Sequence, residues 1–391
     1  MIDLDHNATT PLDPRVREAM VELLARDDLG NPSSRHRRGQ AAREVVEAAR
    51  RRVAQALGAE ALGVTFTSGG TEADDLAVLG VARALRAAGQ PAGVLTSPLE
   101  HPAVRGSAAR LADEGIPVAE LPVDEQGRID PTAVAEALRA DPRLGLVSLA
   151  AANHELGNAY DLPAFVAAAR EVRPQVLVHT DAVQALGKVP VSFAAWGVDL
   201  LSLSAHKLGG PAGVGALVHH RSLRLRPLFA GGQQERGRRP GTEATVLVHG
   251  LGHAVALAGA EQPRRRARAE ALRQRLLEGL GALGARIHGD PVQHTGNTIN
   301  AAFEGCDGEL VMMSLDLAGF AVSTGAACSS GSPSPSPVLR ALGQPPARAR
   351  EALRLSLSAS NTAAEIDALL AALAEILPRV REAGPVVRSA S

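Results

Sequence analysis

At residues 199–211 the chain reads DLLSLSAHKLGGP, and this stretch decides the fold. Its first half is an apolar run about as long as one strand, and its second half carries His206, Lys207 and a pair of glycines. A short apolar run followed by glycines indicates a buried strand, so the two polar residues lie just beyond its carboxyl end. In open α/β sheets ligands bind at that end of the strands. The stretch therefore predicts an α/β sheet with a ligand site at one edge.

Similar apolar runs recur along the first two thirds of the chain and alternate with helical patterns, for example at residues 41–57 and 71–88. Strands separated by helices favour crossover connections, which produce a mostly parallel sheet covered on both faces. The sequence thus predicts an α/β domain with strands near residues 63–67, 93–97, 117–121, 144–151, 176–180, 199–204 and 213–219.

The composition changes after about residue 244, where long helices rich in alanine, leucine and arginine begin. Only two short strands are expected in this part, near residues 297–303 and 353–357. We therefore expect a domain boundary near residue 255, and 391 residues are enough for two domains. Residues 329–337, SSGSPSPSP, form the one low-complexity stretch and are expected to be a mobile loop.

The overall composition excludes several classes of protein. Hydrophobic residues make up 45% of the chain, which is too many for a disordered protein. The 41 basic and 42 acidic residues give a net charge of −1, so neither nucleic acid nor a membrane is expected as a partner. Two cysteines cannot form a disulfide framework, and the acidic first residues do not resemble a signal peptide. We expect a cytoplasmic protein.

Lysine is rare in this chain, because Lys188 and Lys207 are the only two among its 41 basic residues. Arginine replaces lysine as a charge, but it does not deprotonate in proteins and cannot act as an amine nucleophile. One explanation of the two remaining lysines is codon bias that left them by chance. The other is that the protein requires an amine side chain there. Composition alone leaves both open.

Other polar residues fall directly after predicted strands and hence at the same edge of the sheet. The turn SGGTE at residues 68–72 opens a helix, and its N–H groups suit a phosphate. A lysine at this edge can form an imine with an aldehyde cofactor, and an aspartate can keep a pyridine nitrogen protonated. Pyridoxal 5′-phosphate (PLP) has these needs, and the residues that would meet them include Lys207, Asp181, His101, Ser204 and His206.

Each of these residues also has a purely structural explanation. His101 and Asp181 could each cap a helix, and Cys328 could be a small buried hydrophobe. The glycine- and serine-rich surroundings of Cys328 argue against burial, whereas Cys306 precedes an apolar helix and is the better structural cysteine. The sequence HELGN at residues 154–158 lacks the second histidine of a zinc helix, so no metal site is expected.

Motifs spread along the chain carry a family resemblance. The sequence resembles the cysteine desulfurases of the class V aminotransferase family, which are PLP-dependent transferases of fold type I, and within them the subgroup with a long cysteine loop. The resemblance covers nearly the whole chain. Its motifs are LDHNATTP at residues 4–11, GNPSS at 30–34, FTSGGTEA at 66–73, SPLEHPAV at 97–104, HTDAVQ at 179–184, SLSAHK at 202–207 and LRLSL at 353–357.

The resemblance implies a role for each matching residue. Lys207 would form the imine with PLP, His101 would stack on the ring and move protons, and Cys328 would be the nucleophile. Arg354 would bind the substrate carboxylate, a task that suits a bidentate guanidinium, and Asn153 would contact the substrate. Asp181 would pair with the ring nitrogen and Gln184 would reach the ring hydroxyl. The phosphate would be held by Gly70, Thr71, Ser204, His206 and, from a second subunit, Thr242.

The resemblance also implies the domains, the assembly and the reaction. Residues 13–255 would form a large PLP-binding domain, and residues 1–12 with 256–391 a smaller α+β domain, in a homodimer. The reaction would convert L-cysteine to L-alanine and leave a persulfide on Cys328 for a sulfur-acceptor protein, such as an iron–sulfur scaffold in cluster biogenesis. The alternatives are a selenocysteine lyase or another PLP lyase of the same fold, and a non-catalytic partner in a sulfur-transfer assembly.

Three positions depart from the family pattern. The family usually has Asn-Asn-Glu where this chain has Asn153-His-Glu, and His154 could make the cofactor contact of the second asparagine. Pro240 replaces a usual serine and would stiffen the loop between the subunits. Residues 332–337, SPSPSP, replace a more hydrophobic and acidic segment.

Overall fold

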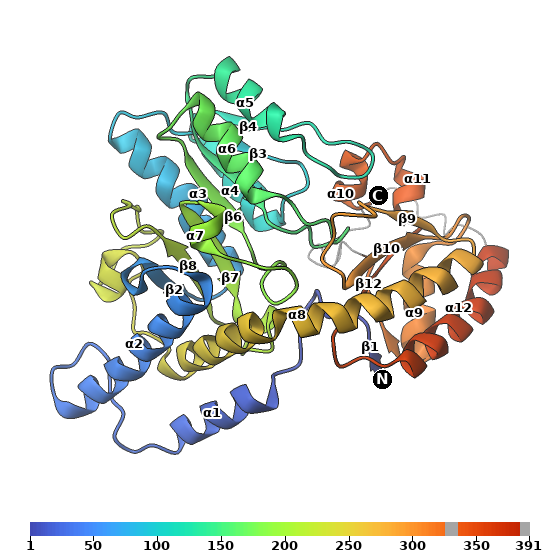
Figure 1. The fold of residues 1–391 in the computed structure, drawn as a ribbon, viewed down its shortest axis with the longest axis horizontal. Helices are drawn as coiled ribbons and strands as arrows, with labels where there is room; N and C mark the ends of the chain where they lie inside the picture. The colour runs from blue at the N-terminus through green and yellow to red at the C-terminus, as the bar shows by residue number, and fades with distance from the viewer. Residues whose placement is uncertain (325–334, 384–391) are drawn as a thin grey trace.

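The structure is a computed structural model that describes residues 1–324 and 335–383, and a seven-stranded sheet forms its larger part (Figure 1). In sheet order the strands are β2 (Val64–Thr67), β8 (Gly215–His219), β7 (Leu200–Ser204), β6 (Leu177–Asp181), β5 (Leu144–Ala150), β3 (Gly93–Thr96) and β4 (Val118–Glu120). β8 is antiparallel to both of its neighbours, and every other adjacent pair is parallel. The predicted fold class is confirmed, and all seven expected strands are present.

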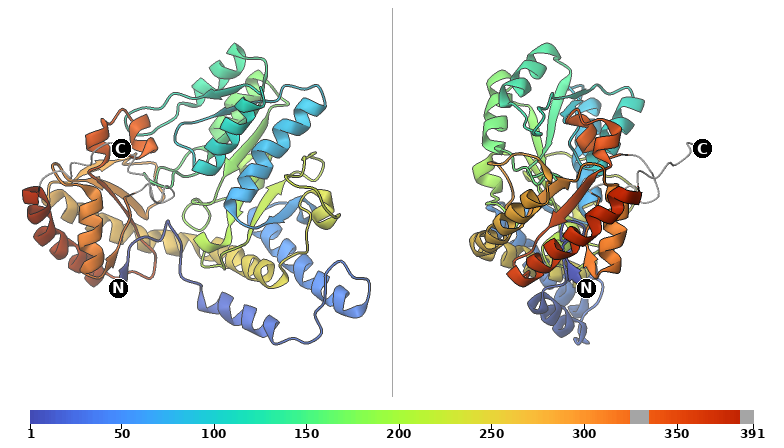
Figure 2. Two further views of the ribbon diagram at one scale, coloured as in Figure 1. Left: turned by 180° about the vertical axis from the view of Figure 1, so that it is seen from behind. Right: turned by 90° about the vertical axis from the view of Figure 1, so that its right-hand side faces the viewer.

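Helices cover both faces of this sheet, as the views in Figures 1 and 2 show. Consecutive strand residues belong to different cores: Leu200 packs with the helices on one face and Leu201 with those on the other. This alternation follows from the two-residue period of a strand. One face carries α3 (Gly70–Ala87) and α4 (Pro102–Asp113), and the other carries α2 (Arg37–Leu57), α5 (Pro131–Ala140), α6 (Leu162–Val172) and the first half of α8 (Thr245–Ala282).

A second, separate core involves both ends of the described chain. It joins Leu4 near the N-terminus to apolar residues of α9, α12, β10 and β12. The two strands expected here are present, but β1, β9 and β11 were not predicted, because two or three residues are too few to show a period. The elements are β1 (Ile2–Asp3), β9 (Arg286–His288), β10 (Thr298–Ala302), α9 (Gly308–Leu317), β11 (Phe320–Ala321), β12 (Ala352–Ser356) and α12 (Ala363–Ala383).

Helix α8 belongs to both cores. Val255 and Ala258 pack in the core of the large sheet, and Leu272 packs in the second core. The predicted domain boundary near residue 255 falls inside this helix and stays a prediction. Shorter elements fill the connections: α1 (Pro14–Leu24), η1 (Ala61–Gly63), α7 (Phe193–Trp196), η2 (Ala205–Lys207), η3 (Gln234–Gly237), α10 (Pro337–Ala341) and α11 (Pro346–Ala349). Within the described ranges, no helix combines the length and the apolarity needed to span a membrane.

The parallel strands bring several predicted site residues to one edge of the large sheet. Asp181, the last residue of β6, is in register with Ala150 of β5 and Ser202 of β7. Ser204 ends β7, and η2 follows it directly. The carboxyl ends of these strands therefore lie side by side, as the sequence predicted.

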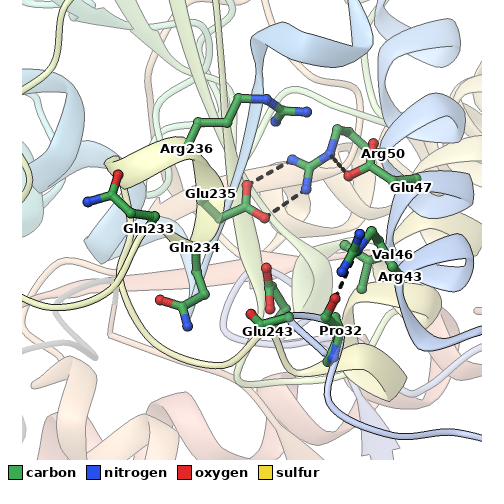
Figure 3. Close-up of a pocket in the computed structure, with 11 residues that line it drawn as sticks. Pro32, Arg43, Val46, Glu47, Arg50, Gln233, Gln234, Glu235, Arg236 and Glu243 are labelled. Carbon is green, nitrogen blue, oxygen red and sulfur yellow. Dashed lines mark hydrogen bonds and ion pairs between the residues drawn. The ribbon is translucent and has the colours of Figure 1, made fainter. Parts of the chain in front are cut away.

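At the outer edge of the sheet, a buried ion pair forms hydrogen bonds with peptide groups of β2 (Figure 3). Arg50 of α2 and Glu235 of η3 form two hydrogen bonds at 2.7 and 2.8 Å, and both side chains are almost fully buried. Arg50 also donates to the peptide oxygen of Val64 at 2.6 Å, and Glu235 accepts from the peptide N–H of Phe66 at 3.0 Å. The pair thus binds the edge strand in the way a neighbouring strand would.

The same ion pair holds a strained turn. Glu235 and Arg236 have φ angles of 47° and 59°, a left-handed conformation that residues with a Cβ rarely adopt. This turn lies beside a cavity of about 490 Å³ that Gln234, Glu243 and Arg43 also line (Figure 3). The chain continues from the turn to Thr242, so Arg50 and Glu235 fix the start of the segment that carries Thr242.

We predict that Glu235→Gln lowers the free energy of unfolding by about 3 kcal/mol, because it removes the buried counter-charge of Arg50 and leaves this guanidinium only the partly exposed Glu47, at 3.1 Å. Denaturant titration of the variant and the wild-type protein measures this loss. Glu171→Gln is the matched control, because Glu171 pairs with Arg139 at 3.1 Å on the surface, where both side chains are more than half exposed. The control is expected to cost less than about 1 kcal/mol. Equal losses in the two variants would contradict the prediction.

Candidate functional site

Lys207 lies at the centre of the candidate site, at the end of η2 directly after β7. Its Nζ donates hydrogen bonds to the peptide oxygens of Asn7 and Ala8 at 2.7 and 2.6 Å. The same N-terminal segment is held by a hydrogen bond from Thr10 N–H to the peptide oxygen of His206 at 2.9 Å. The N-terminal segment therefore packs directly against the lysine.

Asp181 and His101 lie close to this lysine. Asp181 is buried, and its Oδ1 accepts a hydrogen bond from the peptide N–H of Val183 at 2.8 Å. Burial raises the pKa of Asp181, while the nearby charges of His101 and Lys207 lower it. His101 also caps α4, because its Nδ1 accepts from the peptide N–H of Ala103 at 3.2 Å. The structural explanation of His101 as a helix cap is thus confirmed, and the same ring lies next to the candidate site.

His154 stands beside His101, with 5.3 Å between the ring centroids and an angle of 75° between the rings. Burial lowers the pKa of His154 well below 6.5, and the charges of His101, Arg354 and Lys207 lower it further. The imidazole of His154 is therefore neutral near pH 7. As a neutral ring it has one donor and one acceptor nitrogen.

The Asn153 side chain supports the turn after β5. Its Oδ1 accepts from the peptide N–H groups of Glu155 and Leu156 at 2.9 and 2.8 Å. Its Nδ2 donates to the peptide oxygen of Leu99 at 2.8 Å. These bonds leave one Nδ2 hydrogen for any contact with a ligand, so the predicted substrate contact of Asn153 would have to use that hydrogen.

Arg354 comes from β12 in the three-stranded sheet, and only 4% of its side chain is exposed. Its Nη2 donates to Asp5 Oδ1 at 2.6 Å, and its Nη1 donates to the peptide oxygen of His154 at 3.2 Å. Its Nε is buried and has no hydrogen-bond partner among the described residues. A buried guanidinium with a donor to spare suits a carboxylate ligand.

The N-terminus of α3 forms the candidate phosphate site. The helix begins at Gly70 with Thr71 next to it, and among the described residues no side-chain hydrogen bond caps this helix start. A Cβ at Gly70 would lie 2.9 Å from Val183 Cγ2 and 3.5 Å from Ser204 Cβ, so glycine keeps this corner open. Uncapped N–H groups at a helix start suit a phosphate.

His206, another of the predicted phosphate residues, lies in η2 two residues after Ser204. Its Nδ1 is 3.2 Å from Thr9 Oγ1, and burial together with the charge of Lys207 lowers its pKa to about 4. The groups that PLP needs are therefore present together: an amine, a buried carboxylate and a phosphate corner. These residues fit the cofactor.

Asn7 is the central residue that sequence analysis missed. It is almost fully buried, and its peptide oxygen accepts from both Lys207 and Gln184, the latter at 2.9 Å. Its side chain connects Lys188 with Thr298 of β10. Asn7 lies within the motif at residues 4–11, but nothing in the local pattern shows what it contacts.

Two predicted residues are not joined to this cluster. Thr242 is exposed in the segment between η3 and α8, and within the described chain no hydrogen bond links it to the other site residues. Nearby, Arg239 pairs with Glu72 of α3 at 2.9 Å. Cys328 lies outside the described residues. Cys306 is buried in the second core, with its Sγ 3.7 Å from the peptide oxygen of Leu377, as expected for a structural cysteine.

Comparison with known proteins shows the family of this chain. The sequence matches the aminotransferase class-V family over residues 2–369. A cysteine desulfurase of Cereibacter sphaeroides is 44% identical over 387 residues, which cover 98% of this chain and 97% of that protein. A solved NifS-like protein has a TM-score of 0.90 at 34% identity and covers 97% of this chain and 99% of its own. The structure of SspA in complex with cysteine has a TM-score of 0.78 at 30% identity, over 93% of this chain and 100% of that one.

The family match spans nearly the entire sequence, and the structural matches show the same fold over almost their whole length. Members of this family depend on PLP, which confirms the predicted cofactor. The predicted resemblance is also confirmed, and the chain belongs to the class-V aminotransferase family.

Proposed function

We propose that this protein is a cysteine desulfurase that takes sulfur from L-cysteine and holds it as a persulfide on Cys328. One observation carries the proposal: Lys207 donates to the peptide oxygen of Asn7, and Asn7 Nδ2 and Arg354 Nη1 both donate to the peptide oxygen of His154, so the amine and the guanidinium bind neighbouring backbone. Asp181 ends β6, the strand next to β7, which Lys207 follows. The names of two similar proteins support it, one called a cysteine desulfurase and one solved in complex with cysteine.

The site residues divide the work of binding and proton transfer. PLP, when bound, supplies an electron-withdrawing ring that accepts the electrons left at the substrate Cα. Arg354 would bind the substrate carboxylate, and Asp181 would pair with the ring nitrogen of PLP and favour its protonated form. Lys207 would hold the cofactor through its amine and would move the substrate Cα proton. The neutral imidazole of His154 donates or accepts one hydrogen bond.

The sulfur transfer balances without an external oxidant or reductant. The thiolate of Cys328 attacks the substrate sulfur, so an S–S bond forms while the bond between sulfur and Cβ breaks. The electron pair of the broken bond stays with the carbon, which takes up a proton and becomes the methyl group of L-alanine. One L-cysteine and one Cys328 thiol thus give one L-alanine and one Cys328 persulfide.

The assembly and the partners belong to the same proposal. A homodimer would place Thr242 of each subunit at the phosphate corner of the other, and the exposure of Thr242 in the single chain supports this. A sulfur-acceptor protein, with an iron–sulfur scaffold among the options, would take the persulfide sulfur. The low cysteine count supports a reducing compartment such as the cytoplasm.

The central experiment is to incubate the protein with L-cysteine, trap thiols and map modified peptides by mass spectrometry. The proposal expects one extra sulfur atom on the Cys328 peptide and equimolar L-alanine. Rates on L-cysteine and L-selenocysteine, compared in the same assay, separate a desulfurase from a selenocysteine lyase. A purified protein without visible cofactor absorbance would instead favour the non-catalytic alternative.

We predict that Cys328→Ser lowers sulfide release from L-cysteine at least about 100-fold while the cofactor stays bound, because only the attacking thiolate is lost. The sulfide assay and the visible absorbance spectrum measure the two quantities. Cys306→Ala is the matched control, because Cys306 is buried away from the site in the second core. Its sulfide release should remain near that of the wild-type protein. Wild-type release by Cys328→Ser would exclude Cys328 as the nucleophile.

We predict that His154→Asn leaves the shape of the activity profile between pH 6 and 8 unchanged. The pKa of His154 is lowered well below 6.5, so its imidazole stays neutral in this range and takes up a proton only in more acidic solution. Asparagine retains a donor, and the rate should change less than about tenfold. Alanine formation across the pH range measures both. An acidic limb near pH 6.5 that disappears in the variant would contradict the prediction.

A further inference from the structure

Lys188, the first of the two lysines in the chain, lies beside the site but has no part in the reaction proposed above. It follows β6 and lines a small cavity of about 80 Å³ together with Lys207. Its Nζ donates a hydrogen bond to Asn7 Oδ1 at 2.8 Å and another to Gln184 Oε1. Lys207 contacts the peptide oxygen of the same Asn7. Both lysines of the chain therefore bind one residue.

These contacts hold the Gln184 carboxamide in a single orientation. Its Oε1 accepts from Lys188, and its Nε2 donates to the peptide oxygen of Asn7 at 2.9 Å. The carboxamide oxygen faces the amine and the NH₂ group faces away from it. The second Nε2 hydrogen is then available to the cofactor site, so Gln184 acts there as a donor.

We propose that Lys188 is a positioning residue for the cofactor: it fixes Gln184 as a donor to the ring oxygen of PLP, and it holds the side chain of Asn7, whose peptide oxygen accepts from Lys207. The inference rests on the proposed function, since it takes Gln184 and Lys207 as contacts of PLP. An amine donates hydrogen bonds whether or not it is charged, so these two contacts do not depend on the protonation of Lys188.

Positive groups face Lys188 from several elements. Burial lowers the pKa of Lys188 well below 10.5, and the charges of Lys207 after β7 and Arg354 on β12 lower it further. In the N-terminal segment, burial lowers the pKa of His6, and the charge of Lys188 adds to this. Lys188 thus lies among cationic groups that, together with burial, disfavour its own protonation. Two further cations line the same cavity from α8, Arg265 and Arg266.

The test follows the visible absorbance of the full-length enzyme loaded with PLP as a function of pH. Lys188→Met keeps the length of the side chain and removes its donor. We expect the midpoint pH of the change in visible absorbance to be about one unit higher in this variant than in the wild-type enzyme. The reason is that losing the donor at the ring oxygen makes that oxygen more basic. Lys188→Ala is a second variant with the same expected shift, in case Lys188→Met does not fold.

Gln184→Leu should shift the midpoint pH in the same direction. The double variant should shift the midpoint no further than the larger of the two single shifts, because both substitutions interrupt the same series of contacts from Lys188 through Gln184 to the ring oxygen. Gln262→Leu is the matched control, since Gln262 Nε2 donates to the peptide oxygen of Lys188 at 3.1 Å and does not contact its amine. Its midpoint should equal that of the wild-type enzyme.

An unchanged midpoint in the Lys188 variants would overturn the inference, and so would shifts of the single variants that add in the double variant. An equal shift in Gln262→Leu would also overturn it, because the effect would then come from the backbone of this segment. A wild-type protein that shows no cofactor band would overturn the proposed function instead, so the two failures are distinguishable.

Discussion

The hydrogen bonds of Asn7 connect segments from opposite ends of the chain, and the arrangement of the site depends on them. Asn7 is buried, so each of its polar groups must find a partner or cost stability. Some partners follow β5, β6 and β7 of the large sheet, and others lie on or next to β10 and β12 of the three-stranded sheet. They are Lys207, Gln184, Lys188, His154, Asn297, Thr298 and Ser356. The side chain and backbone of Asn7 thus join the edge of the large sheet where Lys207 lies to the three-stranded sheet that carries Arg354.

Much of the fold could be predicted from the sequence, because the large sheet is built from apolar runs that glycines or polar residues bound. β7 and η2 illustrate this: a run of buried residues ends at Ser204, and Lys207 follows at the strand end. The meeting of Asp181 and Lys207 was predictable for the same reason, since adjacent strands with crossover connections end at the same edge. The strand β1 was not predictable, because two residues carry no period.

The role of Asn7 could not be predicted from local pattern either. Its contacts arise only when the N-terminal segment packs against the turn after β7, and such long-range packing leaves no mark on neighbouring residues. His101 shows a different limit. The sequence allowed a helix cap or a cofactor contact as alternatives, whereas the structure shows that the cap itself places the ring next to His154.

Below the site, burial sets the charge of the supporting residues. His179 of β6 lies between Ser148 Oγ and Ser202 Oγ, at 2.8 and 2.9 Å, and burial lowers its pKa to about 3. It therefore joins three adjacent strands as a neutral ring. Burial raises the pKa of Glu100 to about 8, so this acid is largely protonated at neutral pH. These two buried side chains thus add little net charge near Asp181 at neutral pH.

The placement of both lysines beside Asn7 has a consequence for the chemistry of the protein exterior. Because every other basic side chain is arginine, the outer surface displays no ε-amino group apart from whatever part of these two reaches solvent. Acylating reagents that select for amines would meet only the α-amino terminus and the mouth of the site. The extent of labelling by such a reagent would therefore measure how accessible the cavity beside the two lysines is, because almost no other group on the molecule would react.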